Sequence, residues 1–319
     1  MAIIGNSISE AKKILEKGEL VAIPTETVYG LAANALDKEA VLKIFEVKER
    51  PFFDPLIVHI AGLDKLKDYV REIPDMAYKL VEHFWPGPLT IILPKKQIIP
   101  DITTSGLDQV AIRIPNHQLT LGLLKQLDFP LAAPSANPFK YISPTSAEHV
   151  AKQLGDKIPY ILDGGLCSIG IESTIIGFEK GKPVLYRLGG LALEDIERIV
   201  GKTDVQLNSS ANPKAPGQLT NHYAPRKPLF ITNIREFLAE RPSAKIGVIS
   251  FQNLYPVRSA NYSKVLSASG NMKEAAFKLF SALRELDESD VELIVSEIFP
   301  DNFLGRAIND RLKRASRSL

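Results

Sequence analysis

The chain has 319 residues, of which 45% are hydrophobic and 24% charged, and its formal net charge is +2. This composition is typical of a globular protein with room for two domains, and so small a net charge does not indicate a nucleic-acid-binding protein. The longest apolar runs are too short to span a membrane, the N-terminus lacks a signal-peptide layout, and the single cysteine excludes an internal disulfide framework. We therefore expect a cytoplasmic protein without membrane contact.

Helix-capping residues and hydrophobic periodicity divide the first 201 residues into helices and strands. The predicted elements are, in order, a helix over 7–16, a strand over 20–23, a helix over 37–48, a strand over 56–59, a helix over 74–84, strands over 89–93, 110–114 and 129–133, a helix over 145–154, strands over 160–162, 173–178 and 183–188, and a helix over 194–200. Because a helix joins the strands over 20–23 and 56–59, we expect a crossover unit with one crevice at its mouth.

Two of these strands carry an arginine on their polar face. In the strand over 110–114, the valine and the two isoleucines share one face, so Arg113 lies on the other. In the strand over 183–188, Arg187 lies opposite Tyr186 and Leu188.

Residues 202–228 are rich in proline and serine, and their length exceeds that of a plain connection in a compact domain. We expect an extended linker that packs on another part of the protein. Beyond it, the pattern predicts strands over 229–232, 246–250, 265–268 and 293–299, and helices starting at 233 and spanning 272–286 and 306–312. This alternation predicts a small, doubly wound, Rossmann-like α/β domain.

Basic residues crowd the end of the chain, at Arg306, Arg311, Lys313, Arg314 and Arg317. We interpret this cluster as the solvated face of a helix in preference to a binding tail.

Hydroxyl and cationic side chains, with one histidine, lie at or near the ends of several predicted strands. They are Thr25, Thr27, Lys48, Arg50, His59, Arg113, Ser135, Ser143, Ser173, Thr174 and Arg187. Arginine and lysine beside hydroxyls suit a phosphate-bearing ligand, and the ends of strands in an open α/β sheet would bring them together. Phosphoryl and nucleotidyl transfer need positioning and charge stabilisation but no protein nucleophile.

Each of these residues also has a purely structural interpretation. Lys48 and Arg50 could mark a helix exit, His59 could be a core histidine, and residues 135–137 could form only a turn. Arg113 could pair with a buried carboxylate. No single residue decides between the two interpretations.

A series of motifs distinguishes the chain further. These are Pro24-Thr25-Glu26-Thr27-x-Tyr29-Gly30-Leu31, Lys48-x-Arg50-Pro51, Pro55-Leu56-x-x-His59, Ala111-x-Arg113-x-Pro115, Pro134-Ser135-Ala136-Asn137, Ser173-Thr174-Ile175, Pro216-Gly217 and His222-Tyr223-Ala224-Pro225. In this order they resemble the threonylcarbamoyl-AMP synthases in their two-domain form. The resemblance implies a YrdC-type catalytic domain over 1–201 with a twisted, open, mixed α/β sheet, a linker and lid over 202–228, and a small Rossmann-like domain over 229–319.

The resemblance also implies a reaction. Such enzymes combine L-threonine, bicarbonate or carbon dioxide, and ATP with magnesium into threonylcarbamoyl-adenylate and pyrophosphate. The product would pass to a tRNA threonylcarbamoyl-transferase complex that modifies position 37 of tRNA, and a weak contact with RNA would fit that partner.

The residue roles follow from the family pattern. Threonine would be held by Thr27, His59, Arg113 and Ser173, with Arg113 on its carboxylate. ATP would be held by Lys48, Arg50, Asp54, Ser135, Asn137, Ser143, Thr174, Arg187 and Tyr223, with Tyr223 closing over the nucleotide. The residues expected to act in catalysis are Lys48, Arg50 and Arg113. The metal ligands are not implied.

Two stretches depart from the family pattern. Phe52-Phe53-Asp54 stands where the family usually has an amide close to phosphate, so Asp54 could face phosphate or magnesium. Residues 215–221 lack the basic residues that the linker usually carries.

Two other functions use the same domain type or the same basic crevice. One is an RNA- or tRNA-binding module without turnover. The other is a carbamoyltransferase of hydrogenase maturation, which would also need zinc-finger and acylphosphatase segments that this sequence does not show.

Overall fold

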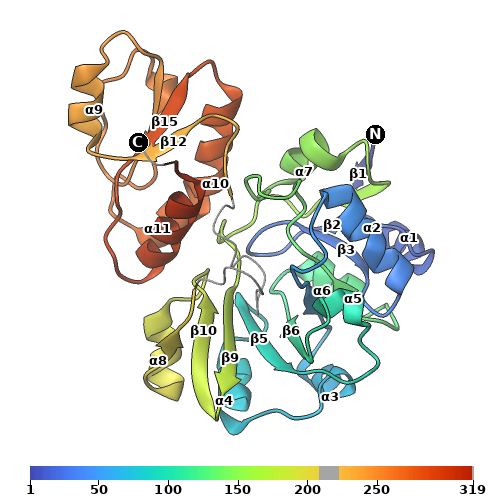
Figure 1. The fold of residues 1–319 in the computed structure, drawn as a ribbon. Helices are drawn as coiled ribbons and strands as arrows, with labels where there is room; N and C mark the ends of the chain where they lie inside the picture. Colours follow the sequence, from blue (N-terminus) through green and yellow to red (C-terminus); the bar gives the residue numbers. More distant parts are fainter. Residues whose placement is uncertain (208–222, 318–319) are drawn as a thin grey trace.

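The computed structural model describes residues 1–207 and 223–317. Most of the expected linker, including His222, lies outside these residues. Within them, the strands form an eleven-stranded mixed sheet and a separate four-stranded sheet (Figure 1). This arrangement confirms the expected fold class. None of the described helices is long and apolar enough to cross a membrane.

The large sheet has the strand order β1-β8-β2-β3-β7-β4-β6-β5-β9-β10-β11. Its strands are β1 (Ile3–Gly5), β2 (Val21–Ile23), β3 (Gly30–Asn34), β4 (Ile57–His59), β5 (Leu89–Pro94), β6 (Gln109–Arg113), β7 (Leu131–Ala132), β8 (Tyr160–Leu162), β9 (Thr174–Glu179), β10 (Lys182–Arg187) and β11 (Asp204–Val205). The accompanying helices are α1 (Ile8–Glu16), α2 (Lys38–Lys48), α3 (Leu66–Tyr69), α4 (Asp75–Phe84), α5 (Asp101–Thr104), α6 (Gln118–Leu124), α7 (Ala147–Leu154) and α8 (Leu193–Val200).

Alternation along β2 places helices on both faces of this part of the sheet. Val21 and Ile23 pack with residues of α1 and α6, whereas Ala22 belongs to the core that includes α2. Helix α1 begins where the Ser7 hydroxyl accepts a hydrogen bond from the Glu10 amide at 3.2 Å. These strands and helices form the rigid wall on which the loops described below are held.

The expected crossover from 20–23 to 56–59 is wrong. β2 pairs antiparallel with β3, and both β3 and β7 separate it from β4. The sequence of β3, Gly30–Asn34, is rich in small residues and carries no β-branched side chain, so it gave no strand signal. As a result, residues 24–29 form the loop of a hairpin and do not begin a crossover.

Other boundaries also differ from those predicted. β7 is shorter than the strand expected over 129–133, and β14 begins earlier and ends earlier than the strand expected over 265–268. Helix α7 is capped by Ser146, whose hydroxyl accepts a hydrogen bond from the His149 amide at 3.2 Å, and not by Thr145. Helix α6 and the short strands β1 and β11 were not predicted.

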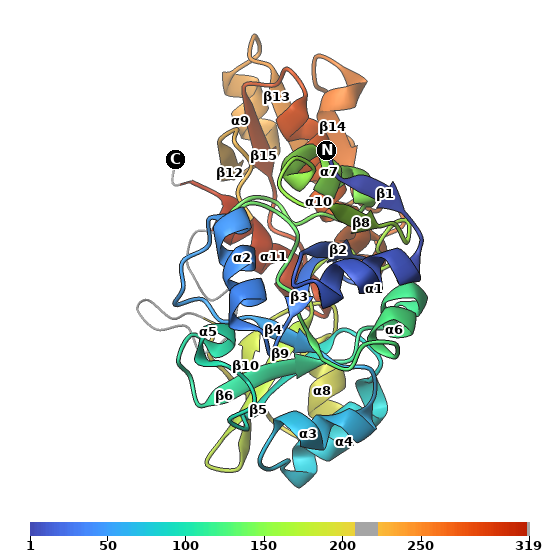
Figure 2. The ribbon, with the colours of Figure 1, turned by 90° about the vertical axis from the view of Figure 1, so that its right-hand side faces the viewer.

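The small sheet is parallel throughout, in the order β12-β15-β13-β14. Its elements are β12 (Leu229–Ile231), α9 (Ile234–Glu240), β13 (Ile246–Ser250), β14 (Ser263–Val265), α10 (Met272–Glu288), β15 (Leu293–Ser296) and α11 (Leu304–Ala315). Val248 and Val295 pack with α9, whereas Ile249 and Ile294 share the core of α10 and α11. Helices therefore cover both faces of this sheet (Figure 2).

Helices α10 and α11 lie between the small sheet and the part of the chain that forms the large sheet (Figure 1). The buried Arg284 of α10 donates hydrogen bonds to the carbonyl of Ile142 and, at 3.1 Å, to the side chain of Gln153. The Tyr141 hydroxyl donates to Asp287 Oδ2 at 2.5 Å. Buried polar contacts of this kind fix one orientation of the two parts, because each contact needs its partner once water is excluded.

The interpretation of the C-terminal basic cluster as a solvated face is wrong for two of its arginines. Arg311 is 0% exposed and Arg314 is 8% exposed. Both lie on the side of α11 that packs against the first part of the chain, where Arg311 bonds to the carbonyl of Leu188 and Arg314 to that of Leu207. The periodicity of the helix was visible in the sequence, but the surface that it meets was not.

Gly189 provides a test of how tightly the loop after β10 meets the strand β9. A Cβ atom at this position would lie 2.4 Å from the main-chain atoms Glu172 O, Ser173 C and Thr174 N. We expect Gly189→Ala to lower the free energy of unfolding in urea by about 1–3 kcal/mol, because neither main chain can move independently.

The control is Gly122→Ala in α6, where a Cβ atom would meet only the terminal methyl group of Ile8, at 3.0 Å. Its effect should stay within about 1 kcal/mol, because alanine also favours the helix. Equal losses in the two variants would contradict the close approach at Gly189.

Candidate active site

A pocket opens where β4, β6 and β10 end, beside the loop between β2 and β3. The space between its walls, open mouth included, is about 550 Å³. His59 and Arg113, the last residues of the parallel strands β4 and β6, lie side by side in register, and Arg187 ends β10. The residues that line it are Thr25, Thr27, Val28, Gly30, Arg50, Ile57, His59, Arg113, Ala133, Pro134, Ser135, Glu172, Ser173, Arg187 and Tyr223.

Arg113 has the orientation that the strand pattern predicted. Its neighbours Val110 and Ile112 belong to the main core, whereas its own side chain reaches the pocket. The guanidinium forms an ion pair with Glu26, with 2.6 Å between Nη2 and Oε1, and donates to Thr27 Oγ1 at 2.8 Å. The alternative of a buried carboxylate partner is therefore also correct, since Glu26 is only 5% exposed.

The hairpin loop that carries Thr27 is held by its own hydroxyls. Thr25 Oγ1 donates to the carbonyl of Val28 at 2.7 Å and accepts from the amide of Thr27 at 3.1 Å. Such local bonds between a hydroxyl and the main chain are what make threonine common in tight loops. They fix Thr27 against Arg113 before any ligand arrives.

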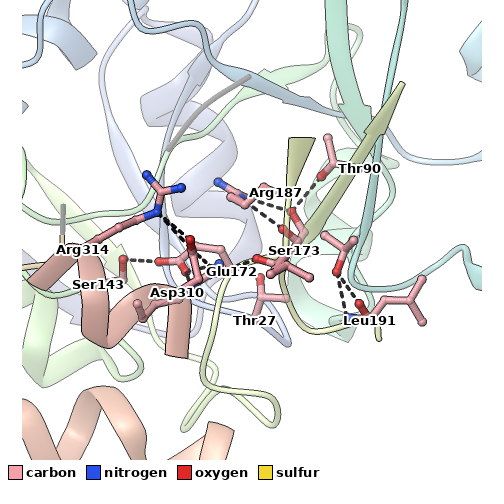
Figure 3. Close-up of polar contacts among 12 residues, drawn as sticks. Thr27, Thr90, Ser143, Glu172, Ser173, Arg187, Leu191, Asp310 and Arg314 are labelled. Atoms are coloured by element: carbon pink, nitrogen blue, oxygen red, sulfur yellow. Dashed lines mark hydrogen bonds and ion pairs between the residues drawn. The ribbon is translucent and has the colours of Figure 1, made fainter. Parts of the chain in front are cut away.

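Ser173 lies between two polar side chains from neighbouring strands (Figure 3). Its hydroxyl is 2.8 Å from Thr90 Oγ1 and accepts from Arg187 Nη2 at 3.0 Å. Arg187 Nε also donates to the carbonyl of Ser173 at 3.0 Å. Burial lowers the pKa of Arg187, because the charged guanidinium loses water contact. Thr174 points elsewhere, and its hydroxyl donates to the carbonyl of Leu191 at 2.6 Å.

Lys48 does not line the pocket but lies behind its wall. Lys48 is 1% exposed, and its ammonium donates hydrogen bonds to the carbonyl of Ser135 and, at 2.5 Å, to that of Asn137. Burial holds the pKa of Lys48 well below its usual value. Asn137 faces the same turn and donates to the carbonyls of Pro138 and Tyr141, both at 2.9 Å. Both residues thus hold the turn that presents Ser135.

Arg50 reaches the pocket and is fixed by the segment that follows it. Its Nη2 lies 2.8 Å from Asp54 Oδ2 and donates to the carbonyl of Pro55 at 2.9 Å, while Nε donates to the carbonyl of Asp54 at 3.0 Å. Asp54 is 0% exposed. The aspartate that departs from the family pattern therefore lies behind Arg50, paired with it.

The candidate residues from the sequence divide into two groups. Those that line the pocket are Thr27, Arg50, His59, Arg113, Ser135, Ser173, Arg187 and Tyr223. Those that lie behind its wall are Lys48, Asp54, Asn137, Ser143 and Thr174.

Sequence reasoning did not identify Glu26 and Glu172 as parts of the site. Glu172 Oε1 accepts from the Ser143 hydroxyl at 2.5 Å (Figure 3). Its Oε2 accepts from Arg311 Nε and Nη2, each at 3.1 Å. The sequence offered a single indication of their role, which is that each glutamate directly precedes a candidate residue. Tyr223, at 1% exposure, stacks on Phe280 of α10 with 5.7 Å between ring centroids.

No cluster of three or more histidine, cysteine, aspartate or glutamate side chains suited to a metal occurs among the described residues. The carboxylates nearest the pocket, Glu26, Asp54 and Glu172, each lie against an arginine. A divalent cation would therefore not find a cage of protein carboxylates in this part of the chain.

Comparison with known proteins agrees with this geometry. Residues 13–189 match the Sua5, YciO and YrdC family, described as "Telomere recombination", and residues 191–317 match the "Threonylcarbamoyl-AMP synthase, C-terminal domain" family. The Pyrococcus abyssi threonylcarbamoyl-AMP synthase is 42% identical over 96% of this chain and 93% of its own length. This chain belongs to the threonylcarbamoyl-AMP synthase family.

A second relative and a solved structure also cover nearly the whole chain. The threonylcarbamoyl-AMP synthase of Bacillus subtilis is 42% identical over 97% of this chain and 92% of its own length. The crystal structure of Pyrococcus abyssi Sua5 complexed with L-threonine superposes with a TM-score of 0.93 at 41% identity, covering 99% of this chain and 98% of that one. The likeness therefore includes both sheets and the pocket at the ends of β4, β6 and β10.

His59 lines the pocket and is buried, at 3% exposure. Burial and the nearby Arg113 guanidinium lower the pKa of His59 to about 3. The unfolded chain binds a proton at this histidine below about pH 6.5, whereas the folded protein does not, so the free energy of unfolding falls as the pH falls through this interval.

We expect the His59 contribution to remove about 2 kcal/mol of stability between pH 7 and pH 5. His59→Gln should lose this part of the pH dependence, which urea denaturation of both proteins at the two pH values will measure. Equal losses of stability in the two proteins would show that His59 is not held neutral in the folded state.

Proposed function

We propose that this chain makes L-threonylcarbamoyl-adenylate from L-threonine, bicarbonate or carbon dioxide, and ATP, with release of pyrophosphate. This reaction is the first step in forming threonylcarbamoyladenosine at position 37 of tRNA. The observation that carries the proposal is the likeness over 99% of the chain to a relative whose crystal structure holds L-threonine. A pocket with three buried arginines and several fixed hydroxyls supports it.

The threonine end of the pocket is assigned to Thr27, His59, Arg113 and Ser173. A carboxylate could share the Arg113 guanidinium with Glu26, since this group has five N–H donors. His59 stays neutral because its pKa is lowered, so it can hydrogen-bond to threonine without adding charge. Arg113 therefore supplies the positive charge that the amino acid carboxylate needs.

The nucleotide end is assigned to Arg50, Ser135, Arg187 and Tyr223. Arg50 and Arg187 line the pocket together with Ser135, and both arginines are buried. The residues behind the wall would hold these groups in place: Lys48, Asp54, Asn137, Ser143 and Thr174. Lys48 would then shape the turn at 135–137 by donating hydrogen bonds to two of its main-chain carbonyls.

The chemistry needs positioning more than it needs a protein nucleophile. The threonine amine attacks carbon dioxide and releases a proton to give a carbamate; with bicarbonate it gives the same carbamate, and the amine proton leaves with the hydroxide as water. A carbamate oxygen then bonds to the α-phosphorus of ATP while the bond to the pyrophosphate oxygen breaks. Arginines fixed before the reaction stabilise the charge that builds on the phosphate oxygens.

Magnesium would enter as the counter-ion of ATP. Around the pocket, Arg50, Arg113, Arg187 and Arg311 are offset by Glu26, Asp54 and Glu172, so four guanidinium groups and three carboxylates leave little net positive charge. A triphosphate brings about four negative charges, which these residues alone do not balance. Mg²⁺ usually binds through phosphates and water with few protein ligands, which fits the carboxylates being already paired.

The product must be consumed by another reaction. A mixed anhydride of a carbamate and a phosphate is an activated acyl donor, so a tRNA threonylcarbamoyl-transferase complex would take it, and brief contact with RNA would assist the transfer. The lone cysteine, Cys167, is a buried free thiol, which supports a reducing compartment such as the cytoplasm.

Pyrophosphate release tests the proposal directly. Release should require both threonine and bicarbonate, and ATP consumption that is equal without threonine would refute the proposed reaction. We expect Arg113→Ala to lower kcat/KM for threonine by about 100-fold, because it removes the charged partner of the carboxylate, while binding of ATP persists.

The matched variant is Arg50→Ala, which removes a buried arginine paired with a carboxylate at the other end of the pocket. It should affect ATP more strongly than threonine. Thermal unfolding of both variants will show whether they remain folded. If each variant weakens both substrates equally, the division of the pocket into two ends is wrong.

A further inference from the structure

Glu172, a side chain in the wall of the pocket, is held by a residue from the second part of the chain. Glu172 lines the pocket directly before Ser173 and is 6% exposed. One of its carboxylate oxygens accepts from Ser143 at 2.5 Å, and the other accepts two hydrogen bonds from Arg311 of α11, at 3.1 Å each. Arg311, which lies 139 positions later in the chain, thus supplies the hydrogen bonds to the second oxygen of this carboxylate.

Arg311 uses all three of its nitrogens in this position. Besides Glu172, it donates from Nη1 to the carbonyl of Leu188 and to Asp310 Oδ2, the latter at 3.3 Å. Its guanidinium carbon also lies 5.3 Å from the ring centre of Tyr223, another residue of the pocket lining. Arg311 therefore contacts two parts of the pocket wall without lining the pocket itself.

The charge of Glu172 makes this contact consequential. A buried carboxylate beside a triphosphate repels it, and low polarity strengthens the repulsion. Arg311 is 0% exposed, so its positive charge is screened little by water and offsets the negative charge of Glu172 directly. Without it, an uncompensated carboxylate would lie next to Arg187, whose guanidinium would turn from the ligand toward the glutamate.

We infer that Arg311 is a positioning residue for the nucleotide end of the pocket, supplied by the second domain. It neutralises Glu172 and keeps that carboxylate turned to Ser143, so that Glu172 does not draw the Arg187 guanidinium away from its place beside Ser173 in the pocket. The second domain is then part of the ATP site and not only an attachment beside it. This inference rests on the proposed function, because it concerns how the same pocket accepts ATP.

The test compares Arg311→Met with the double variant Arg311→Met/Glu172→Gln in the full-length chain. Arg311→Met should raise the KM for magnesium-ATP in pyrophosphate release by about tenfold or more, with a smaller change in the KM for threonine. In the double variant, the amide is uncharged, so the KM for ATP should return to within about threefold of the original value. No rise in KM, or no recovery in the double variant, would overturn the inference.

Arg311→Lys provides a second measurement should the methionine variant fail to fold. Lysine keeps the charge but not the fork of donors, so its KM for ATP should lie between those of the original chain and of a variant without the charge. A lysine variant that is folded but has lost ATP binding completely would show that compensation of charge is not the role of Arg311.

Arg284→Met is the matched control for loosened contact between the two domains. Arg284 is a buried arginine of α10 that donates across the same interface to the carbonyls of Ile142 and Ser143, and to the side chain of Gln153, but not to Glu172. Any change it causes in the KM for ATP should not be reversed by Glu172→Gln. Equal changes in Arg284→Met and Arg311→Met, reversed by Glu172→Gln in neither, would reduce Arg311 to a structural contact and overturn the inference.

Absence of pyrophosphate release that depends on threonine and bicarbonate in the unaltered chain would count against the proposed function itself. Normal release there, together with an unchanged KM in Arg311→Met, would count only against the role of Arg311. The two failures are therefore distinguishable in one set of measurements.

Discussion

The pairing of buried arginines with carboxylates is the constraint on which the pocket depends. A guanidinium removed from water is costly unless a partner offsets its charge. Arg113 has Glu26, Arg50 has Asp54, and Arg311 has Glu172. Arg113 of β6 holds the loop that carries Glu26, Arg50 holds the segment that carries Asp54, and Arg311 of α11 holds the segment that leads into β9. Each pair therefore fixes a different part of the pocket wall.

This pairing also means that the site is arranged before a ligand binds. Arg187 is fixed by two bonds to Ser173, and Thr27 is fixed between Thr25 and Arg113. A ligand carboxylate or phosphate then meets donors that need little movement, which lowers the entropic cost of binding and of reaching the transition state. A ligand must compete with the resident carboxylates, and only an anion of suitable shape gains enough from the shared guanidinium groups.

Local patterns in the sequence predicted what depends on local physics. The orientation of Arg113 followed from alternation along β6, and the caps of α1 and α2 followed from Ser7 and Asp37. Strand β3 was missed because small residues give no periodic signal. Lys48 shows a different limit, since the sequence indicated a cation near Ser135 but not that its ammonium bonds to main-chain carbonyls. Arg311 and Glu172 meet over a separation that no local pattern encodes.

The same constraint bears on whether this basic crevice serves RNA. Nucleic-acid binding draws on cations that are exposed to the phosphates of a long polyanion and on the counterions released there. Here the arginines of the pocket are buried and largely offset by carboxylates, and Arg311 and Arg314 of α11 point inward. With a formal net charge of +2, the chain has little long-range attraction for a polyanion. Charges placed in this way favour a small anionic substrate held at close range over a module that binds RNA through this crevice.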